Sequence, residues 1–373
     1  MPAAVSQIFL YEIFLPAELK LAGLVENSDE VGVFRDLVCR GLIEALKRRA
    51  KNNVDRNYPP IGAIASQNDF DEIRSKFLAF VTSNWDGLAR TYNALEDAGS
   101  KELFISLILF KSLGHTYVRL PSNTASYWSA RASSDAMPAD PSEFTAGACG
   151  YEIERFSIPS SGRELSIECL RANIFFTFKM RQYYYERSEI SVRPEAGDYV
   201  VDAGACFGDT AIDFAETVGH DGRVFSFDPL ERHHRIIEAN IARNEITNIV
   251  LFPSGLGKTD QPGSLVSERV DPGFADLSSV PMRSLDSLVS EGTVERVDFI
   301  KMDIEGHEME ALRGAEAAIR KFRPKLAISV YHRPQDYIEI PDYIRTIDPS
   351  YRLFLENYTI SDGETILYCI AAP

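Results

Sequence analysis

The chain has 373 residues, of which 45% are hydrophobic and 25% are charged, enough to bury one large core or two smaller ones. Its 39 basic and 55 acidic residues give a formal net charge of −16, which would repel the phosphate backbone of a nucleic acid. This balance argues against a nucleic-acid partner, although local basic patches are compatible with it.

The cysteines and the first residues bear on the cellular compartment. The five cysteines are scattered and form no C-x-x-C pair, so neither a disulfide framework nor a zinc site is expected. Residues 1–20 mix Glu12, Pro16 and Glu18 among apolar residues and show no basic leader, so we predict no signal peptide. No apolar run reaches the roughly 20 residues that span a bilayer. We therefore expect a soluble, cytoplasmic protein without a membrane partner.

Residues 1–120 are predicted to form a helical N-terminal domain. Apolar residues recur there at helical spacing, and a further helix is expected over 103–113. The recurring residues are Phe34, Leu37, Val38, Leu42, Leu46, Ile73, Phe77, Phe80, Val81, Leu88, Tyr92 and Leu95. Such stripes normally bury one face of each helix in a bundle, and they can also serve as a homodimer surface or a lid.

Residues 121–180 are predicted to be a linker with a small β segment. Residues 121–150 are rich in Ser, Ala, Pro and Gly and are typical of a loop, in which Tyr127 and Trp128 either line an acceptor pocket or pack against the helices. Two short strands around 160–162 are expected to pair as a hairpin. The third segment, 181–373, is predicted to be the catalytic domain.

The most informative stretch is 197–210, where an apolar strand enters a glycine turn and then a helical pattern. A helix that begins at such a turn presents free backbone N–H groups, and Gly204 and Gly208 allow close approach of the main chain to a ligand. A second apolar strand ends at Asp228, where a carboxylate can bind the hydroxyls of a ribose. The pattern predicts a nucleotide-like ligand at the carboxyl ends of a doubly wound sheet.

Two features distinguish between possible ligands. The glycine spacing is G-x-x-x-G with Cys206 between the glycines, whereas the dinucleotide fingerprint is G-x-G-x-x-G. At the other end of the chain, strands near 351–358 and 365–370 are joined through Asp362 and Gly363, which predicts an antiparallel hairpin. Six helix-alternated strands ending in a hairpin favour the α/β, Rossmann-like, seven-stranded sheet of class I methyltransferases. An NAD(P)-dependent oxidoreductase and a noncatalytic cofactor-binding protein are the alternatives.

Three segments resemble one family of S-adenosylmethionine-dependent enzymes. They are DYVVDAGACFGDTAIDFA at 198–215, VDFIKMDIEGHEMEALRGA at 297–315 and RPKLAISVYH at 323–332. From about Gln182 to the C-terminus the chain resembles the FkbM methyltransferases. The resemblance implies S-adenosylmethionine as cofactor and methyl transfer to an oxygen of a small molecule, such as a polyketide or sugar-bearing natural product.

The expected cofactor contacts follow the strand ends. The turn after the first strand is predicted to wrap the amino-acid and ribose portions, with Asp202 near the ammonium and Tyr183 against the amino-acid end. Cys206 is interpreted as a small turn residue, because nothing nearby in the sequence would activate its thiol. Pro229, Ser254 and Gly255 are expected beside the adenine. The full predicted set is Tyr183, Asp202, Gly204, Ala205, Cys206, Gly208, Thr210, Asp228, Pro229, Ser254, Gly255 and Asp303.

Catalytic candidates lie after two later strands. Asp303 ends the strand 297–303 and either faces the reacting groups or caps the next helix, while Glu305 shares its face if the strand continues. Glu308 is explained by helix capping. His332 follows the strand 325–331 and is the predicted general base, as a neutral imidazole. His233 and His234 are expected to be solvated.

These groups also raise the alternative of a Mg²⁺ site made by Asp303, Glu305 and the imidazole of His332. Hard cations prefer several oxygen ligands, which this set supplies poorly. The prediction is therefore a metal-free reaction.

Overall fold

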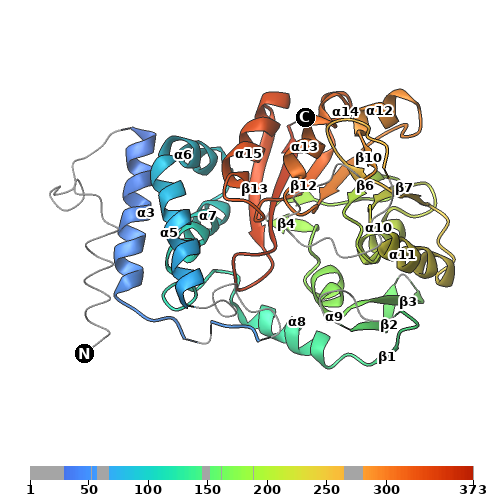
Figure 1. Cartoon of the computed structure of the whole chain (residues 1–373), viewed down its shortest axis with the longest axis horizontal. Helices are drawn as coiled ribbons and strands as arrows, with labels where there is room; N and C mark the ends of the chain where they lie inside the picture. The colour runs from blue at the N-terminus through green and yellow to red at the C-terminus, as the bar shows by residue number, and fades with distance from the viewer. Residues whose placement is uncertain are drawn as a thin grey trace.

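The computed structural model describes residues 29–51, 53–56, 67–144, 152–160, 162–187, 189–263 and 280–372 (Figure 1). Its helices are α3 (Glu30–Leu46), α5 (Gln67–Ser83), α6 (Trp85–Ala94), α7 (Ala98–Leu113), α8 (Ala125–Asp135), α9 (Arg171–Asn173), the π-helix Ile174–Lys179, α10 (Asp209–Val218), α11 (Glu231–Arg243), α12 (Leu285–Ser290), α13 (Glu308–Arg313), α14 (Glu316–Phe322) and α15 (Asp336–Ile347). Its strands are β1 (Ala139–Pro141), β2 (Ile153–Ser160), β3 (Arg163–Leu170), β4 (Tyr185–Arg187), β5 (Ile190–Val192), β6 (Tyr199–Ala203), β7 (Arg223–Phe227), β8 (Ile249–Phe252), β9 (Gly255–Leu256), β10 (Met282–Arg283), β11 (Phe299–Met302), β12 (Lys325–Ser329), β13 (Tyr351–Asn357) and β14 (Thr365–Ala371).

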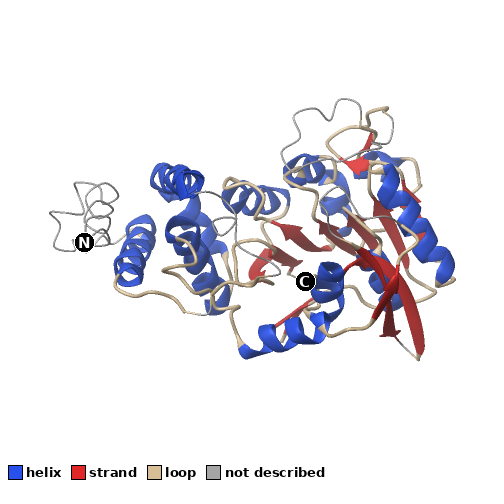
Figure 2. Cartoon of the chain, turned by 60° about the horizontal axis from the view of Figure 1, so that its bottom comes forward, coloured by secondary structure: helices blue, strands red, loops and turns tan. Residues whose placement is uncertain are grey.

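A seven-stranded sheet organises the C-terminal part of the chain. Its strand order is β13-β14-β12-β11-β6-β7-β8, and β14 pairs antiparallel with both β12 and β13. The pairs that join β12, β11, β6, β7 and β8 are all parallel. The sequence prediction of a seven-stranded sheet that ends in an antiparallel hairpin agrees with this topology (Figure 2).

Alternate residues of the central strands enter two different cores. Val200, Val224 and Phe299 pack with α10 and the π-helix on one face of the sheet. Val201, Phe225 and Ile300 enter the larger core on the opposite face, which includes residues of α12 to α15. Because side chains alternate across a strand, a sheet covered on both faces requires apolar residues at nearly every position, as these strands have.

The N-terminal helices share the larger core rather than forming a separate one. Phe34, Leu88 and Phe104 belong to the same cluster as the sheet residues. The chain after α6 also joins the sheet edge, where the Glu96 N–H donates to the Leu353 carbonyl at 2.8 Å. Figure 1 shows α6 and α7 beside α15 and β13. The division at residue 120 therefore remains a prediction, and the N-terminal helices extend the hydrophobic core of the sheet.

Most of the predicted helical stripes are present. The stripe expected over 73–95 is divided into α5 and α6 at Asn84. Two stripe residues do not enter the core, because Leu37 and Ile73 are exposed. The part of residues 121–150 predicted as loop contains α8, and that prediction was wrong for 125–135. The pair β2 and β3 confirms the predicted hairpin.

Tyr127 and Trp128 pack internally. Tyr127 is buried against Phe175, and its hydroxyl donates to Asp55 Oδ2 at 2.7 Å. Trp128 Nε1 donates to Asn123 Oδ1 at 2.9 Å. The alternative of an aromatic acceptor pocket at this pair is therefore wrong.

The described cysteines Cys39, Cys169, Cys206 and Cys369 are free thiols, and Cys149 lies outside the described residues. Among the described helices, none is both long and apolar enough to cross a membrane. The prediction about a signal peptide falls on residues 1–20, which also lie outside the described part of the chain.

Candidate active site

Four parallel strands deliver the chemistry-bearing residues to one edge of the sheet. Gly204 follows β6, Asp228 follows β7, Asp303 follows β11, and His332 comes three residues after β12. These strands are consecutive neighbours in the sheet, so their carboxyl ends lie side by side. The sequence predicted this edge as the ligand site, and open α/β sheets bind ligands there.

The glycine turn after β6 lies directly against the chain after β11. Gly204 has φ of +82°, and a Cβ on it would lie 1.9 Å from the Asp303 carbonyl oxygen. Cys206 also adopts a left-handed backbone, with φ of +51°. Burial, together with the Asp209 and Asp228 carboxylates, raises the pKa of the Cys206 thiol well above its usual range. The thiol is therefore not activated, in agreement with its interpretation as a turn residue.

Asp228 connects this turn to the start of α11. Its Oδ2 accepts the Cys206 N–H at 3.0 Å, and its Oδ1 accepts the Leu230 N–H at 2.9 Å. His233 Nδ1 lies 3.0 Å from the same Oδ2, while the buried His234 contacts the Asp228 carbonyl at 2.9 Å. The expectation that both histidines are solvated was wrong. The sequence signal for His233 was its position in the first turn of α11, five residues after Asp228.

The residues predicted around an adenine lie close to one another. A Cβ on Gly255 would be 3.9 Å from Pro229 Cγ, which brings the ends of β7 and β8 together. Ser254 is buried, and its hydroxyl has no hydrogen-bond partner among the described residues. This grouping is compatible with the predicted wall of an adenine pocket.

Asp202, in β6, is held by neighbouring side chains. Its side chain is fully buried, with Oδ1 3.1 Å from Lys301 Nζ and Oδ2 accepting the Thr210 hydroxyl at 2.9 Å. Lys301 also donates to the carbonyls of Ala203 and Gly204, at 3.0 and 2.6 Å. These contacts join the glycine turn to β11, and the contacts of Asp202 and Thr210 with the cofactor remain predictions.

Replacing Lys301 by methionine is expected to destabilise the fold by about 3–5 kcal/mol, because it leaves the buried Asp202 carboxylate without a counter-charge. Lys76→Met is the matched control, since its pair with Glu72 is exposed and worth about 0–1 kcal/mol. Chemical denaturation measures both. Equal losses of unfolding free energy in the two variants would contradict the role of Lys301.

Asp303 is the centre of the polar cluster. Its Oδ2 accepts the Tyr183 hydroxyl at 2.8 Å, and its Oδ1 accepts the Tyr331 hydroxyl at 3.3 Å. His332 Nε2 lies 3.5 Å from Oδ1. Burial alone would raise the pKa of Asp303, but the positive charges of His332 and Lys301 and the Tyr183 hydrogen bond lower it. Asp303 is therefore an ionised acceptor of hydrogen bonds.

Tyr183 reaches this cluster through an unusual backbone. Its φ is +75°, a conformation that costs a non-glycine residue about 1–2 kcal/mol. Its N–H donates to the Tyr368 hydroxyl at 3.1 Å, and its ring lies beneath Lys301 Nζ at 5.3 Å. The structure thus places Tyr183 at the predicted site, while its contact with a cofactor remains a prediction.

His332 is surrounded by carboxylates. Its Nδ1 lies 3.0 Å from Glu308 Oε1, and its Nε2 lies 3.5 Å from Glu305 Oε2 as well as from Asp303. Burial alone would lower the pKa of this imidazole, but Glu308, Asp303 and Glu305 together raise it to about 9. The sequence predicted a neutral imidazole, whereas the surrounding carboxylates favour imidazolium at pH 7.

The sequence interpretation of Glu308 was a helix cap only, and the structure shows that it also contacts the turn after β11 and His332. Its Oε1 accepts the Ile304 N–H at 2.9 Å, and the residue is 0% exposed. The last acid of the motif Asp-x-Glu-Gly-x-Glu, residues 303–308, was the sequence signal for it. Glu305, by contrast, has a side chain that is 57% exposed.

The same cluster is compact enough to bind a metal ion, because ligand atoms of Asp303, Glu308 and His332 lie within 4.8 Å of one another. Three observations favour another explanation. The Asp303 carboxylate already accepts two tyrosine hydroxyls, Glu308 Oε1 accepts a backbone N–H, and a metal requires neutral imidazole. The metal-free reaction therefore remains our prediction.

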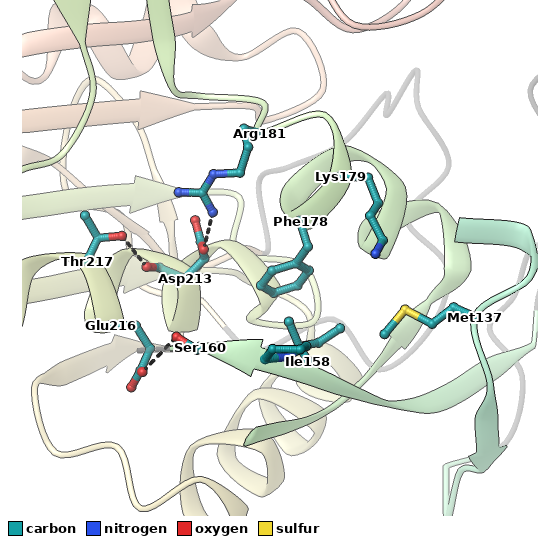
Figure 3. A pocket seen from close by; sticks show the side chains of 10 residues that line it. Met137, Ile158, Ser160, Phe178, Lys179, Arg181, Asp213, Glu216 and Thr217 are labelled. Carbon is teal, nitrogen blue, oxygen red and sulfur yellow. Dashed lines mark hydrogen bonds and ion pairs between the residues drawn. The ribbon is translucent and has the colours of Figure 1, made fainter. Parts of the chain in front are cut away.

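A separate pocket of about 340 Å³ lies away from this edge (Figure 3). It is bordered by Phe178 and Lys179 of the π-helix and by Asp213 and Thr217 of α10. These α10 residues are about 6–12 Å along the helix from its first residue, which adjoins the glycine turn. None of the strand-end residues lines the pocket, so it is not the candidate active site.

Comparison with known proteins agrees with this topology. Residues 202–356 match the family model described as the methyltransferase FkbM domain. The structure of an FkbM methyltransferase from Methylobacillus flagellatus KT is 20% identical, with a TM-score of 0.50, and the match covers 91% of this chain and 70% of that chain. No curated protein matches the chain.

Two further solved structures have lower TM-scores. Aeropyrum pernix fibrillarin, in complex with natively bound S-adenosyl-L-methionine, is 12% identical with a TM-score of 0.36, covering 62% of this chain and 98% of that one. An O-methyltransferase from Bacillus cereus, in complex with S-adenosylhomocysteine, is 16% identical with a TM-score of 0.34, covering 47% and 75%.

The fold and the family match define an S-adenosylmethionine-dependent methyltransferase with a seven-stranded α/β sheet. Residues 202–356 match the FkbM methyltransferase domain, the family that the sequence resemblance indicated. The match is narrower than the predicted extent, since it begins after Gln182 and ends at Glu356.

Proposed function

We propose that the chain transfers the methyl group of S-adenosylmethionine to a hydroxyl oxygen of a small-molecule natural product of the polyketide or sugar-like kind. One observation carries this proposal: the glycine turn and the pair of Asp303 and His332 meet at one edge of the sheet. A glycine turn that admits no side chain at Gly204 lies against Asp303, and Asp303 lies 3.5 Å from His332.

The residues of the turn fit the cofactor. Gly204, Ala205, Cys206 and Gly208 offer main chain for close approach, and Asp228 offers a carboxylate for the ribose hydroxyls. The wall near Pro229 and Gly255 suits the adenine, and Tyr183 suits the amino-acid end. Asp202 supports this cradle through its ion pair with Lys301, and we propose that it also lies near the cofactor's ammonium.

The geometry argues against the oxidoreductase alternative. In a dinucleotide site the second glycine of G-x-G-x-x-G lets the backbone approach the pyrophosphate. Here the corresponding residue is Cys206, whose N–H is already donated to Asp228 Oδ2 at 3.0 Å. In NADP, the phosphate on the 2′-hydroxyl of the ribose would also be repelled by the Asp228 carboxylate and by a net charge of −16.

The chemistry requires mainly positioning. When bound, the cofactor supplies an electrophilic methyl group. The protein must hold an acceptor hydroxyl in line with it, exclude water and remove the hydroxyl proton. Asp303 can accept a hydrogen bond from the acceptor, and His332, in its neutral form, can take the proton at Nε2.

The protonation state of His332 sets the pH dependence. With a pKa of about 9, only about 1% of the imidazole is neutral at pH 7. The charged groups that act on it are Glu308, Asp303, Glu305 and His307, and the Tyr331 ring packs against it. A cationic ligand placed beside Asp303 would lower the pKa of His332 and increase the neutral fraction.

Calorimetry with S-adenosylhomocysteine and with NAD tests the cofactor assignment. We expect the first to bind and the second not to bind. Asp228→Ala should weaken binding of S-adenosylhomocysteine about 10- to 100-fold, because it removes hydrogen bonds to a charged acceptor. Binding of NAD instead, or an Asp228→Ala variant with unchanged affinity, would reject the assignment.

The remaining parts of the proposal rest on sequence and charge. We propose a cytoplasmic enzyme with a small-molecule acceptor and no nucleic-acid partner. The N-terminal helices are a proposed homodimer surface, and α3 presents exposed Val33 and Leu37 one turn apart. Turnover with an acceptor would separate an enzyme from a noncatalytic cofactor-binding protein.

A further inference from the structure

We infer that Glu308 is a positioning residue for His332: it holds the Nδ1 side of the ring and directs Nε2 toward the acceptor. This inference rests on the proposed function, because it requires His332 to act as the base. It assigns a role to a side chain that the sequence pattern explains as a helix cap.

The position of Glu308 excludes direct contact with an acceptor. The residue is 0% exposed and lies beneath the imidazole, with Oε1 3.0 Å from Nδ1. The opposite ring nitrogen, Nε2, faces Asp303 and Glu305, both at 3.5 Å. One side of the ring is therefore held by a buried carboxylate, and the other side meets the sheet edge where the proposed reaction takes place.

The local backbone fixes this carboxylate before any ligand arrives. Glu308 Oε1 accepts the N–H groups of Ile304 and Gly306, at 2.9 and 3.4 Å. The intervening turn uses left-handed backbone at Glu305 and Gly306, with φ of +57° and +92°. The turn after β11 thus folds back on Glu308 and leaves little freedom for its side chain.

The polar atoms of the pair are not satisfied by other groups. Glu308 Oε2 and both nitrogens of His332 are buried, and none has a well-aligned hydrogen bond within the described part of the chain. The 3.0 Å approach of Nδ1 to Oε1 is close enough for a hydrogen bond but poorly oriented. Catalytic hydrogen bonds are often loose without ligands and become better aligned in the substrate complex.

A buried carboxylate at Nδ1 has two consequences for a base. It selects the tautomer with the proton on Nδ1, which leaves the lone pair on Nε2 for the acceptor proton. It also compensates the positive charge that the ring gains when Nε2 takes that proton, as the orienting carboxylate does in a catalytic triad. The proton passes from the acceptor oxygen to Nε2, and the oxygen forms the bond to the methyl carbon as the carbon–sulfur bond breaks.

Glu308→Gln is the main test, with Glu310→Gln as control. Glu310 lies on the same helix, pairs with Arg313 and is partly exposed. The Glu308→Gln variant should lower the limiting kcat at least tenfold and move the rising limb of the pH–rate profile at least one pH unit toward acid. Its affinity for S-adenosylhomocysteine should stay within about threefold of wild type, and Glu310→Gln should change neither quantity.

Several outcomes would overturn the inference. An unchanged pH profile in Glu308→Gln, with turnover lost in His332→Gln, would remove the role of Glu308 while leaving the proposed function intact. Loss of wild-type activity in EDTA, restored by Mn²⁺, would make the cluster a metal site instead. Wild-type protein that fails to bind S-adenosylhomocysteine would reject the function itself.

A second measurement applies if Glu308→Gln does not fold. Glu308→Asp keeps the charge but withdraws the carboxylate by one methylene group. NMR titration of labelled histidines should then show a lower pKa for His332 than in wild type, with His332→Gln providing the assignment. An unchanged titration of His332 in Glu308→Asp would also overturn the inference.

Discussion

Replacing His332 by glutamine should lower kcat about 10²–10⁴-fold, because general base catalysis by a positioned side chain contributes about that much. Glutamine keeps the approximate size and polarity of the side chain but cannot take the proton. Binding of S-adenosylhomocysteine should stay within about threefold of wild type, since His332 contacts Asp303 and Glu308 rather than the glycine turn. Steady-state kinetics and calorimetry measure the two quantities.

The pH profile makes this prediction specific. In wild type, kcat/KM should increase with pH along a rising limb that levels off above the pKa of about 9, because the fraction of neutral imidazole increases over that range. The limb should be absent in His332→Gln. His220→Gln is the control, because His220 is 93% exposed and pairs only with the neighbouring Asp221 in the described structure. A His332→Gln variant with wild-type kcat and pH profile would show that another group removes the proton.

Replacing Gly204 by alanine should abolish cofactor binding or reduce it at least 100-fold. The new Cβ would lie 1.9 Å from the Asp303 carbonyl oxygen, which is backbone and cannot rotate away. The turn and the chain after β11 must therefore separate, which displaces both the cofactor cradle and the catalytic carboxylate. The variant should also be less stable, because alanine is strained at φ of +82°.

Gly197→Ala separates these two effects. Gly197 has a similar φ of +84°, but a Cβ there would meet nothing within 4 Å. This control should lose only the conformational contribution of about 1–2 kcal/mol and should bind S-adenosylhomocysteine normally. Thermal unfolding and calorimetry on both variants give the comparison. If Gly204→Ala bound the ligand as well as Gly197→Ala, the contact between the turn and Asp303 would not matter for the site.

The sheet could be predicted from the sequence because its signals are local. Continuous apolar strands, the glycine turn at 204–208 and the Asp-Gly turn at 362–363 each identify their element without knowledge of the rest. The predictions that failed depend on tertiary contacts. The helix at 125–135 has few large apolar residues, and it is held by contacts such as that of Tyr127 with Asp55.

The candidate site divides in the same way. The strand-end rule located Gly204, Asp228, Asp303 and His332, because a strand's last residue is visible in the sequence. It could not reveal that Asp202 pairs with Lys301 across neighbouring strands, since that contact depends on sheet register. The protonation state of His332 could not be predicted from the sequence either, because it depends on the buried Glu308 carboxylate at the start of α13.

A crystal structure of the protein with S-adenosylhomocysteine tests the central claim most directly. The account predicts ligand density along the turn from Gly204 to Gly208, with the ribose on Asp228 and the sulfur facing Asp303 and His332. Density for the ligand at another place, or a sulfur atom directed away from both side chains, would contradict it.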